Sequence, residues 1–177
     1  MSVFKTYSLE SLAEFPNRSE KLAIFERDPV KGADEFFQKI MINKFKIKGQ
    51  VFRNNSYNHI KSLIESVVPK KVNSEPFYSI WLKDMSNMCK YFCDFLKIES
   101  VGFSLGTKRV CKRYHVDNVP MRLLVTYAGK GTEWIPDEFV DRNAYENGLP
   151  NESILKNPSR SKFINTWDVA IFRGGSD

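Results

Sequence analysis

The spacing of the apolar residues changes near Ser100 and divides the chain into two patterns. Before Ser100, apolar side chains recur three and four positions apart, most clearly from Ser79 to Leu96, which is the period of a helix with one buried face. After Ser100, short apolar or β-branched stretches are separated by glycine and proline, which is typical of strands. Helices followed by strands predict an α+β fold.

The 177 residues are enough for one domain. We therefore predict a single domain, 1–177, with a helical or mixed part at 1–99 and a β-rich part at 100–177. Helices are expected at 34–42, 58–68 and 79–96. Strands are expected at 21–25, 45–52, 101–110, 119–127, 132–135 and 167–172. The polar, Asn- and Pro-rich stretch 137–160 is expected to be a long loop with room for one helical turn.

The composition excludes several classes of protein. A hydrophobic fraction of 42% and a charged fraction of 27% argue against disorder. No apolar stretch approaches the roughly 18 residues that span a bilayer, and the N-terminus has no basic region followed by an apolar one. Three cysteines do not suggest a disulfide framework. These features predict a cytoplasmic protein without a membrane partner, in which Cys89 and Cys93 are reduced core residues.

The formal net charge of +6 permits an anionic partner but does not require one. The basic residues are spread along the chain, and no zinc-finger spacing, RNP-like aromatic strand or other nucleic-acid module accompanies them. A nucleic-acid partner is therefore not expected. A small-molecule substrate is the expected partner, and the sequence does not indicate the oligomeric state.

Two histidines are present. His59 is expected on the polar side of its helix, as a solvated residue. His115 lies two residues before Asp117, and in an extended chain residues i and i+2 point to the same face. Such a pair supplies two ligands of the 2-His-1-carboxylate triad that holds Fe(II) with open positions. The alternative is a hydrogen-bonded pair at the end of a strand.

The residues around this pair resemble two families. The His-x-Asp, the following strand to Tyr127 and the turn Gly129-Lys130-Gly131-Thr132-Glu133 resemble the first half of the double-stranded β-helix of iron- and 2-oxoglutarate-dependent oxygenases. The stretch 111–136 resembles more closely an uncharacterised bacterial domain-of-unknown-function family, number eighteen twenty-six, whose late strand resembles 167–174. Members of that family often lie near zinc-homeostasis genes.

The resemblance implies N-terminal helices packed on a double-stranded β-helix, a jelly-roll or cupin-like architecture. It implies a mononuclear metal centre that uses His115 and Asp117 with Fe(II), or Zn, and 2-oxoglutarate as co-substrate. Four neighbours are candidate substrate or cofactor residues. Arg122 would pair with an acidic substrate, or else with Asp117 or Glu133. Tyr127 and Trp134 would line a pocket, or belong to the core. Glu133 would assist the metal, or be a surface charge.

A basic cluster precedes the motif and consists of Lys108, Arg109, Lys112 and Arg113. It would attract an anionic substrate, or form a solvated face. In both families a second histidine follows the late strand, whereas this chain has no histidine after His115. The sequence leaves three explanations open: the chain ends before that ligand and the β-helix is incomplete, the fold is kept without the chemistry, or Cys111, Tyr127, Glu133 or an external ligand completes the site.

Three functions follow from these observations. The first is an oxygenase-like enzyme with an unknown substrate. The second is a non-catalytic metal-binding protein of the same fold, linked to zinc homeostasis. The third is a metal-free, partner-binding domain in which His115 and Asp117 form a structural hydrogen bond.

Overall fold

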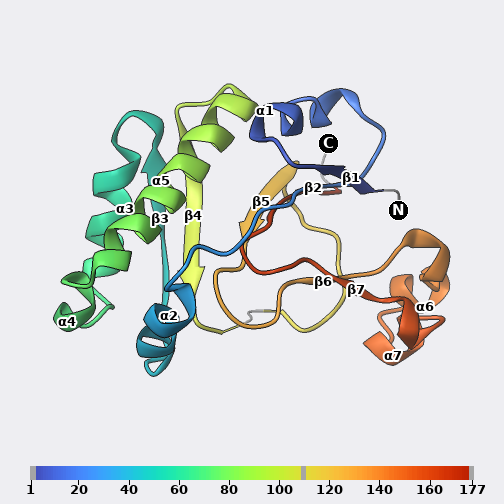
Figure 1. Cartoon of the computed structure of the whole chain (residues 1–177). Helices are drawn as coiled ribbons and strands as arrows, with labels where there is room; N and C mark the ends of the chain where they lie inside the picture. Colours follow the sequence, from blue (N-terminus) through green and yellow to red (C-terminus); the bar gives the residue numbers. More distant parts are fainter. Residues whose placement is uncertain (1–2, 109–110, 176–177) are drawn as a thin grey trace. The chain divides into compact units, whose positions relative to one another are not determined.

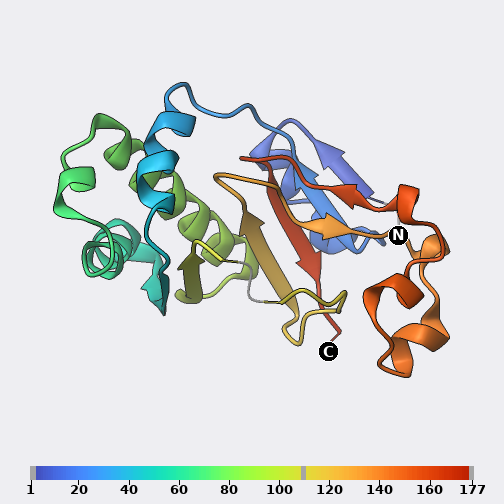
Figure 2. The same ribbon diagram turned by 90° about the horizontal axis from the view of Figure 1, so that it is seen from below.

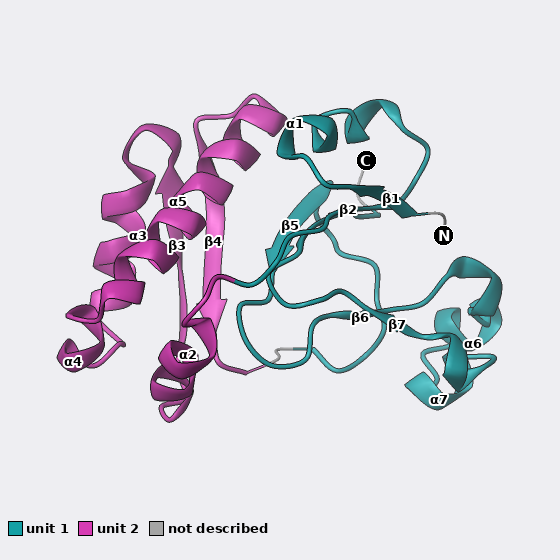
Figure 3. Ribbon diagram, in the orientation of Figure 1, with its two compact units in different colours: residues 1–29, 111–177 teal, residues 30–110 magenta. Residues whose placement is uncertain are grey.

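The computed structural model describes residues 3–108 and 111–175. The chain forms two compact units: unit 1 consists of residues 1–29 and 111–177, and unit 2 consists of residues 30–110 (Figure 3). Helices and several small sheets are present, so the predicted α+β class is confirmed. None of the helices in the described part of the chain combines the length and the apolar character that crossing a bilayer requires.

Unit 2 is a two-stranded sheet covered on one face by helices (Figure 1). The antiparallel strands β3 (Lys46–Phe52) and β4 (Ser100–Gly106) pair along their whole length. Ile47, Val51 and Val101 are buried on the face that α3 and α5 cover. The helices are α2 (Ala33–Met41), α3 (Ser56–Glu65), α4 (Lys70–Asn73) and α5 (Pro76–Leu96), and a 3-10 turn, Arg53–Asn55, precedes α3.

The longest helix, α5, confirms the prediction from apolar spacing. It begins with Pro76 in its first turn, where the missing N–H of proline is harmless, and its C-cap Lys97 adopts the left-handed conformation. Phe77 and Trp81 of α5 meet Phe36 and Phe37 of α2 at ring-centroid distances of 5.1–6.0 Å. Cys89 and Cys93 are buried free thiols, as expected for core residues.

Unit 1 contains a four-stranded sheet in the order β1-β2-β8-β5. β1 (Val3–Thr6) runs parallel to β2 (Leu22–Phe25), and β8 (Val169–Arg173) pairs antiparallel with both β2 and β5 (Met121–Val125). Figure 2 shows β5 and β8 side by side as the gold and red arrows. A second pair, β6 (Glu133–Trp134) with β7 (Lys162–Phe163), and the short α1 (Leu9–Leu12) and 3-10 turn Phe15–Asn17 complete this part.

The expectation of a long loop at 137–160 is wrong. This stretch forms the helices α6 (Arg142–Glu146) and α7 (Asn151–Ile154) and the 3-10 turns Asp137–Phe139 and Pro158–Arg160. Asp141 caps α6 by accepting a hydrogen bond from the Ala144 amide. Four buried side chains give the segment its own small core: Ile135, Val140, Ala144 and Ile154. Because each helix is only about one turn long, one buried apolar residue every few positions is enough to stabilise the segment. So sparse a pattern does not indicate a helix in the sequence.

The last expected strand begins later than its apolar run indicated. Trp167 adopts a φ of 74°, a left-handed conformation that is rare for a bulky residue, and β8 starts at Val169. The Trp167 side chain is nevertheless buried, and its amide donates to the Thr126 carbonyl oxygen at 2.8 Å. The strands β1 and β7 were not expected from the sequence, because four and two residues are too few to show a period. Val110, the end of the expected strand at 101–110, lies outside the described residues.

Candidate functional site

The His-x-Asp pair lies in an irregular segment, 111–120, that leads into β5. Arg113 fixes this segment to the end of α6. Its guanidinium donates to the carbonyl oxygens of Gly148 at 2.8 Å and Tyr145 at 3.1 Å, and also to that of Leu149. Tyr145 lies in the last turn of α6, where a cation opposes the negative end of the helix dipole. Arg113 is therefore a structural clamp, and not part of a solvated face.

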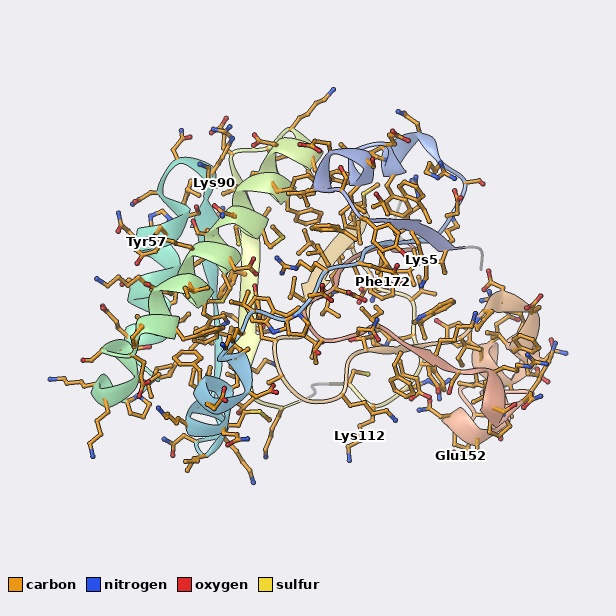
Figure 4. All side chains as sticks on the ribbon, in the orientation of Figure 1. Lys5, Tyr57, Lys90, Lys112, Glu152 and Phe172 are labelled. Carbon is orange, nitrogen blue, oxygen red and sulfur yellow. The ribbon has the colours of Figure 1, made fainter. Side chains whose placement is uncertain are left out.

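A second anchor comes from α7. The side-chain amide of Asn151 accepts from the Tyr114 amide at 2.9 Å and donates to the Lys112 carbonyl oxygen at 2.6 Å. These two hydrogen bonds tie the backbone just before His115 to α7. Figure 4 shows Lys112 and Glu152, the neighbour of Asn151, along the same edge of unit 1. Lys112 itself is exposed, and Arg109 lies outside the described residues.

The other side of the segment is held by the residues that follow β8. The Gly174 amide donates to the Pro120 carbonyl oxygen, and the Gly175 amide to that of Asp117, both at 2.9 Å. A Cβ atom on Gly174 would lie 1.8 Å from the Val119 carbonyl oxygen, so only glycine permits this approach. The backbone that carries Asp117 is therefore fixed on both sides.

Three charged or ionisable side chains converge on this loop: His115, Asp117 and Arg122. Asp117 Oδ1 lies 3.5 Å from His115 Nε2, and Asp117 Oδ2 accepts a hydrogen bond from Arg122 Nε at 2.6 Å. The carboxylate is the least exposed of the three, with 17% of its side chain accessible against 48% for His115 and 47% for Arg122. The predicted partnership of Arg122 with Asp117 is thus the one the structure contains.

The hydrogen bonds of the imidazole determine which nitrogen is available. His115 Nδ1 lies 2.8 Å from the Arg113 carbonyl oxygen. A carbonyl oxygen can only accept, so Nδ1 carries the proton. In the neutral ring, Nε2 then presents a lone pair, and that lone pair faces the carboxylate of Asp117. Two acceptors at this distance repel each other unless a proton or another cation lies between them.

The other candidate residues lie elsewhere in unit 1. Tyr127 follows the far end of β5, and its ring packs edge-on against Trp167 at 5.0 Å. The five residues of β5 separate its ends by about 14 Å, so Tyr127 is remote from Asp117. Trp134 is buried against Leu22 and Ala170 in the core of the four-stranded sheet. Neither aromatic ring lies in the His115 loop.

Glu133 meets the residue before His115. Its carboxylate accepts a hydrogen bond from the Tyr114 hydroxyl. Burial raises the pKa of Tyr114 to about 12, and the bond to Glu133 adds to the rise. Since Tyr114 also packs on the small core formed with Ile135 and Val140, Glu133 supports the segment from the β6 side.

Within 3–108 and 111–175, no group of three or more His, Cys, Asp or Glu side chains is placed to hold a metal ion. The Cys111 sulfur lies 3.7 Å from the Arg113 carbonyl oxygen, which is also the partner of His115 Nδ1. Cys111 is therefore on the Nδ1 side of the imidazole and not beside Nε2, where a metal ligand would be needed. His59 is half-buried and not simply solvated, since its Nδ1 accepts from the Phe52 amide at 3.2 Å. Among the described residues, the ligands available to a metal at this loop are therefore the two of the motif.

Together these features define an α+β protein with a His-x-Asp pair and an adjacent arginine on a loop that is anchored through its backbone. The chain belongs to the family described as "Protein of unknown function (DUF1826)", whose model matches residues 7–176. This confirms the resemblance to the uncharacterised family number eighteen twenty-six that the sequence indicated. No curated protein and no solved structure matches the chain.

Proposed function

We propose that the loop binds one divalent metal ion through His115 Nε2 and Asp117 Oδ1. The observation that carries the proposal is the arrangement of the imidazole. Nδ1–H is held by the Arg113 carbonyl, and Nε2 faces a carboxylate oxygen with its lone pair. Metal-binding histidines in proteins commonly donate their second N–H to a backbone carbonyl in this way, which fixes the ring and makes it a better ligand.

The distance between the two ligand atoms fits a shared ion. Two ligands that each lie about 2.0–2.2 Å from a tetrahedral ion are about 3.3–3.6 Å apart. The separation of Nε2 and Oδ1 is 3.5 Å. Arg122 bonds to the other carboxylate oxygen, so it orients Asp117 without occupying Oδ1. Water or an exogenous ligand would fill the remaining positions.

The charges around the site favour an acidic co-ligand. The charges of Asp117 and Arg122 cancel, so a bound divalent ion would give the site a net charge of about +2. A dicarboxylate such as 2-oxoglutarate restores neutrality. Arg122 Nε is used by Asp117, while the terminal guanidinium nitrogens have no partner within the described residues and suit a carboxylate. This balance supports an oxygenase-like enzyme whose substrate is not identified by the sequence. Fe(II) with open positions supplies oxidation chemistry in such enzymes.

The finer architecture belongs to the same proposal. In a double-stranded β-helix of the oxygenase type, the strand after the His-x-Asp and a late strand bring their ends to one site. Here β5 and β8 are antiparallel neighbours, and Met121 at the start of β5 pairs with Arg173 at the end of β8. The residues that follow β8 therefore lie against Asp117. This pairing supports a jelly-roll-like arrangement of unit 1.

The test is metal binding by the intact chain under anaerobic conditions. Purified protein is analysed for bound metals and titrated with Fe(II) and with Zn(II) by calorimetry. His115→Ala and Asp117→Ala should each abolish binding, whereas His59→Ala, the matched control at the other histidine, should bind like the original chain. Binding that survives both motif variants would place the metal elsewhere and overturn the proposal.

A second titration tests the enzyme class. Addition of 2-oxoglutarate to the Fe(II)-loaded protein should give the visible charge-transfer absorption of an Fe(II)–keto acid complex. Arg122→Ala should weaken 2-oxoglutarate binding far more than Fe(II) binding, because both proposed metal ligands remain. If Fe(II) binds but 2-oxoglutarate neither binds nor is consumed, the oxygenase-like function is wrong.

A non-catalytic zinc-binding function is the second candidate, and the ligand spacing favours it. Neighbouring ligands of an octahedral ion at about 2.1 Å are only about 3.0 Å apart, closer than Nε2 and Oδ1 here. Zinc is usually tetrahedral, but it normally takes three or four protein ligands. Stoichiometric zinc in the purified protein, with no effect of 2-oxoglutarate, would support this candidate. No metal binding at all would support a metal-free domain in which His115 and Asp117 form a structural pair.

A further inference from the structure

Unit 2 carries nearly all of the excess positive charge of the chain. Residues 30–110 contain 14 Lys and Arg against 7 Asp and Glu, a net charge of +7. Residues 1–29 and 111–177 contain 13 against 14, a net charge of −1. A strongly basic part beside a nearly neutral one is typical of proteins that bind a polyanion through one part.

The strand pairing gathers basic residues on one face. In β3, side chains alternate between the face covered by α3 and α5 and the opposite, outer face. Lys46 and Lys48 point outward and are exposed, and Lys44 continues the same alternation before the strand. On β4 their cross-strand partners are Gly106 and Ser104. Lys108 follows on the same side and is exposed.

This outer face contains no carboxylate. It consists of Lys44, Lys46, Lys48, Gln50 and Phe52 on the β3 side and of Ser100, Gly102, Ser104, Gly106 and Lys108 on the β4 side. Among the residues that the structure describes, its lysines have no acidic partner. The lysine side chains are about 7 Å apart along the strand. Lys46 and Lys48 stand opposite Gly106 and Ser104, which have little or no side chain, so this part of the row is open along one flank.

Gly102 gives independent evidence of a partner. Glycine within a strand is less stable than alanine unless the position requires it. At Gly49 a Cβ atom would lie 2.7 Å from the end of the Leu63 side chain of α3, which would have to shift, and at Gly106 it would meet the Phe45 carbonyl oxygen at 3.1 Å. A Cβ atom on Gly102 would meet nothing within 4 Å, and its backbone needs no left-handed angle. A partner that approaches the sheet closely accounts for this glycine.

An aromatic ring stands at the end of the lysine row. Phe52 follows Lys48 and Gln50 on the same face, and 47% of it is exposed. His59 packs edge-on against it at 5.5 Å and fixes its position. A row of cations that ends in an exposed, held aromatic ring suits an extended strand of nucleic acid. Phosphates pair with the lysines and a base stacks on the ring.

We propose that the outer face of the β3–β4 sheet binds single-stranded nucleic acid. Lys44, Lys46 and Lys48 contact successive phosphates, Phe52 stacks on a base, and Gly102 lets the strand approach the sheet. The sequence did not suggest this partner, because no nucleic-acid module is present and the cations appear scattered until β3 pairs with β4. The proposal does not depend on the metal site, which lies in unit 1.

The test uses the full chain and a fluorescein-labelled single-stranded oligonucleotide, followed by fluorescence anisotropy. Three phosphate contacts should give a slope of about −2 for the logarithm of the association constant against the logarithm of the salt concentration. Lys46→Glu with Lys48→Glu should weaken binding about tenfold or more. Lys70→Glu with Lys71→Glu makes the same change of net charge on α4 of the same unit and should weaken it far less. Phe52→Ala should weaken binding about tenfold without changing the salt slope.

Gly102→Val separates binding from folding. A valine there meets no neighbour and favours a strand, so the variant should melt at a higher temperature and yet bind the oligonucleotide more weakly. Equal losses in the two lysine double variants would overturn the proposal, because binding would then follow net charge alone. Absence of binding by the original chain would also overturn it. So would preferential binding of vesicles that contain phosphatidylserine, with the same dependence on Lys46 and Lys48.

Discussion

At the residue scale, Gly131 and Gly174 are the two described glycines of unit 1 that have no room for a side chain. Neither glycine needs a left-handed backbone angle. A Cβ atom on Gly131 would lie 1.7 Å from the Ile164 carbonyl oxygen, and one on Gly174 would lie 1.8 Å from that of Val119. Both contacts are with backbone, which cannot move aside as a flexible side chain can. Each glycine therefore fixes the spacing of two chain segments.

Gly174→Ala should destabilise the protein and disturb the His115 loop together. The added methyl group pushes the 117–120 backbone away from β8, at a cost of about 1–3 kcal/mol. Urea unfolding measures the loss, and metal titration should show weaker binding if the proposed centre is correct. Gly102→Ala is the matched control, since its methyl group meets nothing within 4 Å. A Gly174→Ala variant as stable as the original chain would contradict the close approach.

Asp168 should be a major determinant of stability although it is not in the candidate site. Its carboxylate is buried and accepts from the Arg27 and Asn165 amides, both at 3.2 Å. Asp168→Ala leaves two partly buried N–H groups without these acceptors, at about 1–3 kcal/mol in total. Asp168→Asn keeps one acceptor oxygen, so its stability in urea unfolding should lie between that of the original chain and that of Asp168→Ala. Equal stability of the alanine and asparagine variants would argue against the two-bond account.

The sequence predicted the candidate site at this scale only in part. The i and i+2 spacing correctly put His115 and Asp117 on one side, with a 3.5 Å separation of their polar atoms. The supports of the loop were missed. Arg113 looked like one of several solvated cations, because its acceptors lie 32–36 positions away, at the end of a helix that the sequence did not reveal. The glycine pair after β8 was the one available signal.

At the element scale, prediction succeeded where a period had room to develop. The 21 residues of α5 repeat their apolar stripe several times. The helices α6 and α7 have five and four residues, which is about one turn, so no period is visible. Their stability comes from the Asp141 cap and from contacts with Ile135 and Val140. Helix caps and contacts with residues distant in sequence determine whether such short helices form, and the spacing of apolar residues reveals neither.

The buried acids of α5 should make unit 2 sensitive to alkali. Burial raises the pKa of Tyr78, of Tyr91 and of Cys89 to about 12. Their ordinary values are 10.0 for tyrosine and 9.0 for cysteine. Above these values the unfolded chain loses protons that the folded chain keeps, so the free energy of unfolding falls as the pH rises. The loss begins near pH 9 and continues to about pH 12.

Urea midpoints measured between pH 8 and pH 11 check this prediction, with reducing agent present throughout. The midpoint should fall with increasing pH. Tyr91→Phe should make the fall shallower, because one of the three groups is removed. Its hydroxyl is buried without a hydrogen-bond partner in the described part of the chain, so the same variant should not lose stability at neutral pH. A midpoint that stays constant up to pH 11 would show that these groups ionise alike in both states.

At the scale of the whole molecule, the connectivity of unit 1 could not be inferred from the order of patterns along the chain. Its central strands, β2 and β8, are paired through Leu22 and Phe172, 150 positions apart. Between them the chain forms unit 2 as one continuous segment. The sequence indicated a helical part followed by a β-rich part, whereas β4, on the β-rich side of Ser100, pairs with β3. Partner choice between strands depends on tertiary contacts that local periodicity does not encode.

Residues 30–110 should fold when expressed alone. Both strands of the β3–β4 ladder lie inside this segment, and so do α3 and α5, which cover the sheet, and the aromatic contacts between α2 and α5. A continuous segment with its own sheet and core meets the criteria of an independently folding unit. Circular dichroism should show helix, and urea should unfold the fragment in one cooperative transition. The fragment 30–99 is the matched control: without β4 it leaves β3 unpaired and removes Val101 from the buried face of the sheet, so it should not fold. If 30–110 is as disordered as 30–99, unit 2 depends on the rest of the chain for its stability. If the fragment 30–110 folds and binds the oligonucleotide, the binding site lies in unit 2 and does not need the His115 loop.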